Sequence, residues 1–430
     1  MKGMTLRAMT QAVNGIYHGN GEDYDKEITA ITIDSRKVAE GGLFIAIKGE
    51  RSDGHDFIGQ CFEKGAACVI SEKELPDEER SYIQVESSLQ ALKDLALLYR
   101  NNLDVKVVGI TGSVGKTSTK ETISSVLSEK YRVLKTLGNF NNEIGLPLTV
   151  FRLTEDDEVA VLEMGISDFG EMDRLSKIAQ PDICVITNIG FCHLENLGTR
   201  DGILKAKTEI FNHMNPDGIV IVNGDDDKLS TISQVHGKRP LVFGISNKDG
   251  VYADNIKSLG LDGTSFTIHG IKTSDNYSTF DLTVPVPGHH MVYNAMAAAL
   301  VGSVLGLSSI EIECGVKNLK TIAGRNNIIK ENGFTIIDDC YNANPVSMKA
   351  SLDVLDTAIG RKVAILGSMF ELGENEKQMH YDVGMYLGTK DIDVLITAGD
   401  LAAQIAAGTR AYIDTNYNAH GCEVHDFETR

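Results

Sequence analysis

One short run of residues constrains this chain more than any other, because it places two glycines and a lysine between a predicted strand and a predicted helix. The run consists of Thr111, Gly112, Ser113, Val114, Gly115, Lys116 and Thr117. The apolar residues 106–110 before it are typical of a buried strand, and residues 123–131 after it repeat apolar side chains at helical spacing. A strand, a glycine turn and a helix in this order form a backbone that binds the phosphates of a nucleotide.

Each residue type in this run has a use in phosphate binding. Glycines let backbone N–H groups surround phosphate oxygens, and the start of the helix adds positive potential. Lys116 adds a full positive charge, and the hydroxyl of Thr117 can reach a Mg²⁺ ion. The general motif has a glycine five residues before Gly115, where this chain has Ile110, so the match is to a shorter form that starts at Gly112. An ordinary glycine-rich turn with a surface lysine is the alternative.

The composition is that of a globular protein with more than one domain. A chain of 430 residues is too long for one ordinary core. The net charge of −19 argues against broad nucleic-acid binding, which needs a basic surface. No apolar run is long enough to span a bilayer, and the N-terminus lacks the apolar core of a signal peptide. Seven cysteines without a CxxC pair then favour reduced thiols and a cytoplasmic location.

The alternation of apolar runs predicts an α/β protein with three domains, at residues 1–102, 103–317 and 318–430. The first is a small α/β domain that ends in a helical stripe at 89–99 and a polar break at Asn101 and Asn102. The second is a mostly parallel sheet covered by helices, with hairpins attached between 251 and 286 and an alanine-rich helix at 294–304. Strands are expected at 28–33, 43–47, 105–110, 133–136, 159–162, 183–189, 219–222, 335–337, 363–366 and 394–397.

Polar residues follow several strands of the predicted central sheet. Active sites in parallel sheets gather at the carboxyl ends of the strands. Glu163 follows the strand 159–162 and, beside the phosphate-binding run, is a reasonable ligand for Mg²⁺, which takes few protein ligands. Asn188 ends the strand 183–187, and His193 lies in the loop after it, where a histidine is more often a bystander than a ligand.

Other polar segments allow both a functional and a structural interpretation. The loop 138–145, which contains Asn142, is either a turn or a set of donors to a polar ligand. Asp339 suits ribose hydroxyls or a helix N-cap, and Arg325 suits a phosphoryl group or a surface acid. Lys207 lies in an amphipathic helix, and by pattern alone it belongs to a solvated face.

Taken in order, these motifs resemble the Mur ligases of peptidoglycan synthesis. The resemblance runs from about Ile33 to the end of the chain. It implies a UDP-substrate-binding domain, an ATP-binding central domain and a Rossmann-like C-terminal domain. Glu163-Met164-Gly165 and residues 338–345 are more typical of the member that joins D-alanyl-D-alanine to a UDP-N-acetylmuramoyl-tripeptide. The other matching segments are Asp34-Ser35-Arg36, 111–117, 138–149, 188–195 and 206–211.

The resemblance also implies a role for each matching residue. ATP and Mg²⁺ would be the cofactors, those two substrates the partners, and the protein a monomer. The residues expected to bind ATP are Gly112, Ser113, Val114, Gly115, Lys116, Thr117, Asn294 at the adenine, Arg325 at the phosphates and Asp339 at the ribose. Thr117, Glu163 and His193 would hold Mg²⁺, and Ser35, Arg36 and Asn142 would bind substrate. Lys116, Lys207, His193 and Arg325 would be catalytic, with Lys207 carbamylated.

The chain also departs from the family pattern. Met291 stands where the family usually has asparagine, and Ser368 where it usually has aspartate. Members generally continue past the position of Arg430 through a further strand, a Lys-Gly-Ser motif and a final helix, so the third domain is expected to be truncated, with an unpaired sheet edge.

The alternatives to the ligase are a nucleotide-binding protein without ligase turnover and an amide ligase of the folate–polyglutamate or cyanophycin type. Because ATP contacts are expected from two domains, closure of the third domain on the second is predicted.

Overall fold

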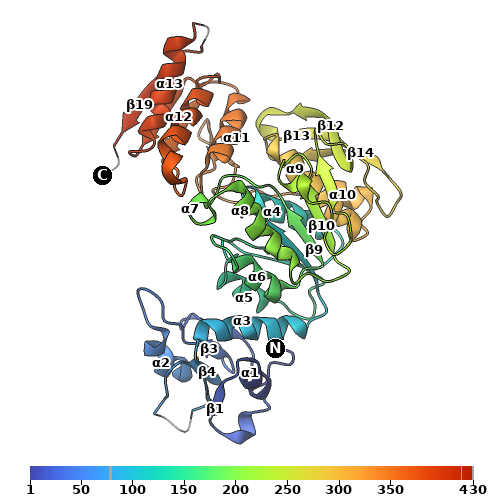
Figure 1. Ribbon diagram of the computed structural model, residues 1–430, viewed down its shortest axis with the longest axis vertical. Helices are drawn as coiled ribbons and strands as arrows, with labels where there is room; N and C mark the ends of the chain where they lie inside the picture. The colour runs from blue at the N-terminus through green and yellow to red at the C-terminus, as the bar shows by residue number, and fades with distance from the viewer. Residues whose placement is uncertain (77–79, 418, 429–430) are drawn as a thin grey trace.

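The computed structural model describes residues 1–76, 80–417 and 419–428, and this part of the chain forms three α/β units in a row (Figure 1). The N-terminal unit extends to helix α3 (Ser88–Asn101), the central unit carries strands β6 to β14, and the third unit carries β15 to β19. Helix α3 lies between the N-terminal and central units, and the other end of the central unit faces the third (Figure 1). The arrangement confirms the predicted α/β class.

The N-terminal unit is built on a small sheet with the strand order β1-β5-β4-β3-β2. The strands are parallel except β1, which pairs antiparallel with β5. The expected strands 28–33 and 43–47 are present but shorter. The elements are α1 (Leu6–Ala12), β1 (Ile16–His18), β2 (Ile31–Thr32), β3 (Leu43–Ile45), α2 (Ile58–Glu63), β4 (Cys68–Ser71), β5 (Tyr82–Gln84) and α3.

The central unit contains a long sheet with the order β14-β13-β12-β11-β10-β9-β6-β8-β7. It is parallel from β12 to β7, and β12, β13 and β14 pair antiparallel, which confirms the hairpins expected between 251 and 286. The strands are β6 (Lys106–Thr111), β7 (Val133–Lys135), β8 (Val159–Glu163), β9 (Ile183–Ile186), β10 (Ile219–Asn223), β11 (Leu241–Gly244), β12 (Val251–Ser258), β13 (Thr264–His269) and β14 (Thr279–Val284).

Helices cover both faces of this sheet, because successive residues of its buried strands point to opposite sides. Val107 belongs to a core shared with α3, α5, α6 and α8, whereas Val108 belongs to a core shared with α4, α9 and α10. The helices are α4 (Lys116–Leu127), α5 (Gly145–Val150), α6 (Glu171–Ala179), α7 (Leu194–Leu197), α8 (Arg200–Thr208), α9 (His290–Val304) and α10 (Ser309–Lys317). The carboxyl ends of the parallel strands, with the polar residues that follow them, face the third unit.

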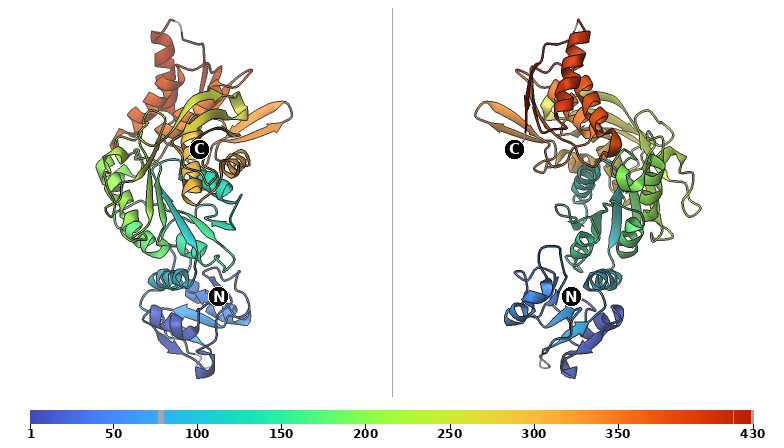
Figure 2. Two further views of the ribbon diagram at one scale, coloured as in Figure 1. Left: turned by 90° about the vertical axis from the view of Figure 1, so that its right-hand side faces the viewer. Right: turned by 60° about the vertical axis from the view of Figure 1, so that its left-hand side comes forward.

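The third unit contains the three strands expected of it, but they do not form one sheet. Its parallel strands have the order β17-β18-β19, and β19 lies at one edge. The expected strand 335–337 is present within β16, but β16 pairs antiparallel with β15 in a separate hairpin that projects from the unit (Figure 2). The turn of this hairpin is Asn332-Gly333, both with positive φ, which is the signature of a tight two-residue hairpin turn. The elements are β15 (Asn327–Glu331), β16 (Phe334–Asp338), α11 (Pro345–Asp356), β17 (Val363–Gly367), α12 (Glu376–Leu387), β18 (Val394–Ala398), α13 (Ala403–Thr415) and β19 (Glu423–Phe427).

None of the helices in the described part of the chain combines the length and the apolar character that crossing a membrane requires.

Candidate active site

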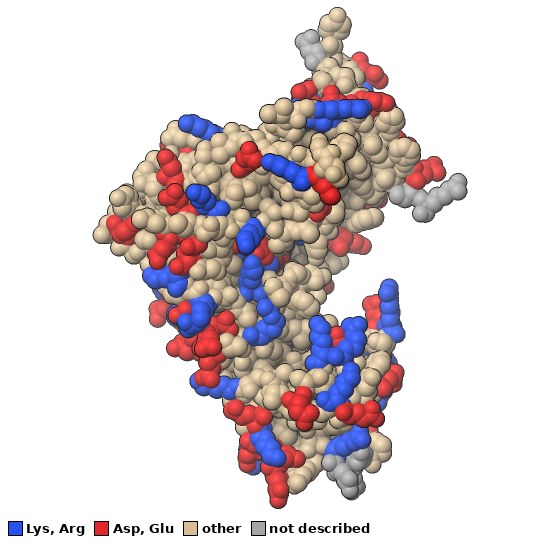
Figure 3. Space-filling model, turned by 180° about the vertical axis from the view of Figure 1, so that it is seen from behind, with Lys and Arg blue, Asp and Glu red and all other residues tan. Residues whose placement is uncertain are grey.

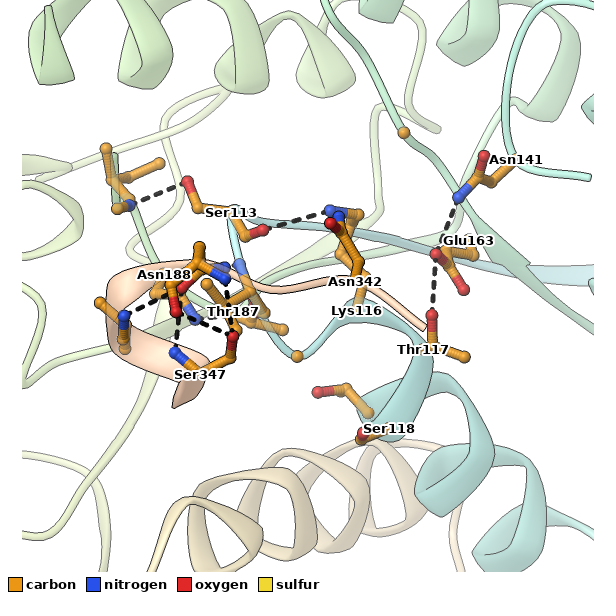
Figure 4. A pocket seen from close by; sticks show the side chains of 18 of the residues that line it. Ser113, Lys116, Thr117, Ser118, Asn141, Glu163, Thr187, Asn188, Asn342 and Ser347 are labelled. Carbon is orange, nitrogen blue, oxygen red and sulfur yellow. Dashed lines mark hydrogen bonds between the residues drawn. The ribbon is translucent and has the colours of Figure 1, made fainter. Parts of the chain in front are cut away.

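A cavity of about 940 Å³ lies where the carboxyl ends of the central strands face the third unit. It is large enough for a small molecule of nucleotide size. Figure 4 shows labelled side chains of the central unit around it together with Asn342 and Ser347 of the third unit. Most of the residues predicted from the sequence line it: Ser113, Val114, Gly115, Lys116, Thr117, Asn142, Glu163, His193, Asn294, Arg325 and Asp339.

The glycine run forms a tight loop between β6 and α4. Gly115 has a φ of 82° and immediately precedes Lys116, the first residue of α4, so the loop turns directly into the helix at the wall of the cavity. Gly112 also needs to be glycine, because a Cβ there would lie 1.9 Å from Oγ1 of Thr187. The ammonium of Lys116 donates to the carbonyl oxygen of Gly112 at 2.8 Å, which holds the charge directly over the loop.

The loop after β9 fixes the shape of the glycine loop. Asn188 accepts a hydrogen bond from the Val114 N–H at 2.9 Å and donates its amide to the Val114 carbonyl at 2.9 Å. Thr187 donates its hydroxyl to the same carbonyl at 2.7 Å, and the Gly190 N–H donates to the hydroxyl of Ser113 at 2.8 Å. The backbone of the glycine loop is therefore organised by the side chains of Thr187 and Asn188, which directly follow β9.

Thr117 and Glu163 meet beside this loop, as the sequence predicted for a metal site. The Thr117 hydroxyl lies 3.1 Å from Oε1 of Glu163, and the amide of Asn141 donates to the same oxygen at 2.8 Å (Figure 4). Glu163 is 2% exposed, and its other oxygen, Oε2, has no hydrogen-bond partner among the described residues. A buried carboxylate oxygen without a hydrogen-bond donor needs a cation nearby, and here the Lys120 ammonium lies 3.8 Å away. Hydroxyl and carboxylate oxygens are also ligands that Mg²⁺ prefers, so the Thr117–Glu163 pair fits a Mg²⁺ ion.

Lys120 is a further charged residue of this site that the sequence analysis did not identify. Its side chain is 1% exposed and donates to the Thr136 carbonyl at 2.8 Å. Its ammonium also lies 3.0 Å from Glu121 and 3.8 Å from Oε2 of Glu163. The available signal was its position on α4, one turn before Ile123 on the buried face of the helix.

Lys207 lies behind the cavity and not on its lining. Its side chain is 1% exposed, and its ammonium makes no hydrogen bond or ion pair with any residue that the structure describes. Burial lowers the pKa of Lys207 to about 7, and the charge of Lys116 acts in the same direction. The solvated helix face that the pattern alone indicated for this residue is therefore wrong.

His193 is near the charges of Lys207 and Lys116, and it contacts the third unit. Its Nδ1 is 3.0 Å from the carboxylate of Glu371, a residue of the loop after β17. Burial lowers the pKa of His193, the Glu371 carboxylate raises it, and the charges of Lys207 and Lys116 lower it further. Within the described residues, no group of three or more histidine, cysteine, aspartate or glutamate side chains is arranged to hold a metal, so His193 and Glu163 are not assembled into such a group.

The far end of the cavity is built by helix α9. Asn294 accepts a hydrogen bond from the Thr119 hydroxyl at 2.9 Å, and its amide nitrogen lies 3.2 Å from the sulfur of Met291. Tyr293, one residue earlier, donates its hydroxyl to Asp225 at 2.8 Å. Asp225 also accepts N–H bonds from residues 245–247, so it fixes the loop after β11 at the cavity wall.

The third unit contributes Arg325 and Asp339 to the opposite wall. The guanidinium of Arg325 lies 4.3 Å from the ring centre of Tyr341, which also lines the cavity. Asp339 accepts an N–H bond from Asn326 at 3.1 Å and a hydroxyl bond from Ser351. It is not a helix N-cap, because that role belongs to Asn344, which caps α11.

Ser35 and Arg36 lie outside this cavity, on the N-terminal unit. The Arg36 guanidinium pairs with Asp34 at 2.9 Å and lowers the pKa of that carboxyl to about 2. The Ser35 carbonyl accepts a hydrogen bond from Lys64 at 2.9 Å. Figure 3 shows a hollow between the N-terminal unit and the rest of the molecule, with lysine and arginine side chains gathered on the N-terminal side of it.

Comparison with known proteins agrees with this arrangement. Three family models match the chain in order: the Mur ligase family catalytic domain at residues 27–100, the Mur ligase middle domain at 110–302, and the Mur ligase glutamate ligase domain at 324–430. The UDP-N-acetylmuramoyl-tripeptide–D-alanyl-D-alanine ligase of Bacillus subtilis strain 168 is 40% identical over 427 residues, which is 98% of this chain and 91% of the relative. The chain belongs to the Mur ligase family.

Other Mur ligases give the same result. The ligase of the same name from Escherichia coli K12 is 34% identical over 412 residues, 95% of this chain and 89% of the relative. The crystal structure of MurF from Acinetobacter baumannii superposes with a TM-score of 0.86 at 33% identity, and covers 99% of this chain and 95% of that one. MurF from Thermotoga maritima in complex with ADP has a TM-score of 0.79 at 31% identity, with 93% of each chain covered.

The structure also accounts for one residue at which this Mur ligase departs from its family. The hydroxyl of Ser368 accepts a hydrogen bond from the Ala402 N–H at 3.2 Å, at the start of α13. A hydroxyl can accept this N–H as an aspartate can, so the serine is compatible with the fold. Nothing in the structure explains the methionine at position 291, beyond its buried contact with Asn294.

Proposed function

We propose that this Mur ligase joins D-alanyl-D-alanine to UDP-N-acetylmuramoyl-tripeptide with the hydrolysis of ATP, in the synthesis of peptidoglycan precursors for the cell wall. The observation that carries the proposal is the cavity in which the Lys116 loop and the Thr117–Glu163 pair face Arg325 and Asp339 of the third unit. The close relatives that carry this activity in their names support the choice of substrates.

The chemistry requires a nucleotide. A carboxylate does not react with an amine near neutral pH, because it has no good leaving group. Transfer of the γ-phosphoryl group of ATP to the carboxylate forms an acyl phosphate, the amine attacks its carbonyl carbon, and phosphate leaves from the tetrahedral intermediate. Two anions must approach each other in the first step, so Lys116 and Arg325 act by reducing their repulsion and by positioning.

Thr117, Glu163 and His193 are the residues that would hold Mg²⁺. The metal supplies positive charge at the phosphate oxygens. Lys120 keeps the Glu163 carboxylate in place from behind, and Asn141 holds its other oxygen. For His193 to take part, its bond with Glu371 has to open or be shared. Asn294 would contact the adenine, and Asp339 the ribose.

The environment of Lys207 suits carbamylation. The neutral amine attacks CO₂, one N–C bond forms, and a proton is released, so the cation becomes a carboxylate-like anion. A pKa of about 7 leaves a large share of the amine neutral at physiological pH. The product would place a negative charge near Lys116 and His193, where it can support a second metal ion.

The N-terminal unit is proposed to bind the UDP group through Ser35 and Arg36, and Asn142 to contact the same substrate at the cavity. The gathered basic side chains in Figure 3 suit a diphosphate. The domain boundaries 1–102, 103–317 and 318–430 remain the proposed division. A monomer fits a cavity whose lining comes from one chain, and a cytoplasmic location fits the use of ATP.

The test is phosphate release by the purified protein with ATP and Mg²⁺. The ligase predicts release that requires both UDP-N-acetylmuramoyl-tripeptide and D-alanyl-D-alanine, together with a product that contains the new amide bond. Release without either substrate, or none at all while ATP still binds, would favour a nucleotide-binding protein without ligase turnover. Glutamate addition to a folate with no binding of the UDP-sugar would favour the other amide ligase.

A further inference from the structure

The loop 138–145 is held to the rest of the molecule by a carboxylate that none of the proposed steps uses. Glu143 accepts a hydrogen bond from Lys93 at 2.6 Å and from Arg174 at 2.5 and 3.1 Å. Lys93 belongs to α3 of the N-terminal unit and Arg174 to α6 of the central unit. Glu143 therefore joins the loop to two helices from different units.

The same loop reaches the proposed metal ligand two residues earlier. Asn141 donates its amide to Oε1 of Glu163 at 2.8 Å, and its carbonyl accepts the Gly165 N–H at 2.8 Å. Asn142 lies between the two contacts, and its side chain accepts the N–H groups of Ile144 and Gly145, which closes the turn. A displacement at Glu143 is thus transmitted over a short, internally bonded segment to the Glu163 carboxylate.

The ion pair of Glu143 with Lys93 is more sheltered from water than its ion pair with Arg174, whose side chain is 45% exposed. The side chains of Lys93 and Glu143 are 12% and 24% exposed, whereas those of Lys2 and Glu155, another pair between the same two units, are 56% and 64% exposed. Charges that are mostly withdrawn from water are screened less by solvent and salt. Arg174, and then Lys93, also hold the pKa of Glu143 below its ordinary value, so the carboxylate is ionised at neutral pH.

We propose that Glu143 is a positioning residue that anchors the loop 138–145 on α3 and α6 and thereby aligns Glu163 for metal binding. The inference rests on the proposed function, because it takes Glu163 as a metal ligand. Loss of the Glu143 charge leaves Lys93 and Arg174 without the anion between them, so the loop shifts and Asn141 no longer holds Oε1 of Glu163.

The test measures metal affinity directly. Mn²⁺ is titrated into the full chain in the presence of ADP, and electron paramagnetic resonance detects the bound ion. Glu143→Gln is expected to raise the Mn²⁺ concentration for half-saturation by about 3- to 10-fold, the range expected for loss of a charged hydrogen bond. Lys93→Met is expected to give a smaller shift in the same direction, and Lys93→Arg, which keeps the charge, little shift. The double variant Lys93→Met with Glu143→Gln should bind no more weakly than Glu143→Gln alone.

The matched control is Lys2→Met, which breaks the exposed ion pair with Glu155 between the same units and should leave Mn²⁺ binding unchanged. Thermal unfolding of each variant verifies the fold, and Lys93→Met provides the test if Glu143→Gln does not fold. Wild-type Mn²⁺ affinity in both Glu143→Gln and Lys93→Met would overturn the inference. Glu163→Gln separates the two proposals: if it leaves Mn²⁺ binding intact, the proposed metal site is wrong, and if it alone weakens binding, the role of Glu143 is wrong.

Discussion

Between the N-terminal and central units the contact is apolar and continuous, whereas between the central and third units it is polar and surrounds a cavity. On the first side, Leu92, Leu95 and Ala96 of α3 belong to the same core as residues of α5 and α6. Tyr99 adds a bond to the Leu153 carbonyl at 2.6 Å, and Arg100 one to the Ala179 carbonyl at 3.3 Å. These two units share one core and are expected to move together.

On the second side, few bonds join the two units among the described residues. The one from Asn326 is buried, and the others lie at the surface or at the rim of the cavity. The amide of Asn326 donates to the Pro287 carbonyl at 2.7 Å, Lys330 approaches Asp262 at 3.5 Å, and His193 meets Glu371. The exposed contacts break at low cost. We therefore expect the unit bearing Arg325 to move against the other two, so that variants at the cavity change catalysis and variants in the shared core change stability.

The largest change in kcat is expected at Lys116, beside the phosphates of the proposed nucleotide. Lys116→Met removes the charge over the glycine loop and should lower kcat by about 100- to 1000-fold, because that charge opposes the repulsion between two anions. The melting temperature should stay near that of wild type. The assay is phosphate release with both substrates present. As a control, Lys106→Met removes the lysine at the start of β6, the strand that precedes the glycine loop. Equal losses of kcat in the two variants would contradict the role assigned to Lys116.

A variant at the interface between the N-terminal and central units should change the free energy of unfolding instead of kcat. Leu95→Ala opens a cavity in the shared core, where Leu95 is fully buried, and should lower the free energy of unfolding by about 2–5 kcal/mol. Urea denaturation followed by circular dichroism measures this. The folded variant should keep kcat within about twofold of wild type. Separate unfolding of the N-terminal unit in the wild-type protein would show that the two units do not share one cooperative core.

Lys207 is expected to reduce stability while it supports activity. Lys207→Met should lower kcat by less than Lys116→Met does, and it should raise the free energy of unfolding on the order of 2 kcal/mol at pH 7, because a buried charge is replaced by an apolar side chain. The sign with pH follows from the pKa of about 7 in the folded chain against 10.5 for the free side chain. Below pH 7 the advantage of the variant is constant, and from pH 7 to 10.5 it shrinks, since the unfolded wild-type chain binds the extra proton there. An advantage that grows with pH would contradict the burial of a protonated lysine.

The smallest effect is expected at the movable interface itself. Glu371→Gln removes the carboxylate beside His193 and should lower the pKa of His193 further, because that carboxylate favours the imidazolium. The change in the free energy of unfolding should be below about 1 kcal/mol. A proton NMR titration of the histidine measures the shift. An unchanged or raised pKa would mean that the two side chains do not meet in solution.

Features that depend on local sequence were predictable, and the site was located through them. The glycine loop and Glu163 could be placed because each follows an apolar strand directly, and parallel strands bring their carboxyl ends together. The hairpin β15–β16 had a local signal too, since Asn332-Gly333 favours a two-residue turn, but only the strand 335–337 was predicted, without its partner strand β15.

Features that depend on distant neighbours could not be predicted from pattern. The position of Lys120 on α4 was a local signal for its burial, but its contacts with Thr136 and Glu163 come from other elements and could not be predicted from the pattern. Glu143 likewise owes its role to Lys93 and Arg174, which lie 50 and 31 residues away. The expectation for Lys207 came from the family resemblance, because helical spacing alone indicated exposure.

The central claim is that the third unit closes on a rigid pair formed by the other two. Small-angle X-ray scattering of the full chain tests it most directly, with and without a non-hydrolysable ATP analogue, Mg²⁺ and UDP-N-acetylmuramoyl-tripeptide. If the third unit closes, the radius of gyration should be smaller with the ligands bound. Rotation of the third unit alone should then fit the scattering curve. An unchanged scattering curve with the ligands bound, or one that requires the N-terminal unit to move against the central unit, would contradict it.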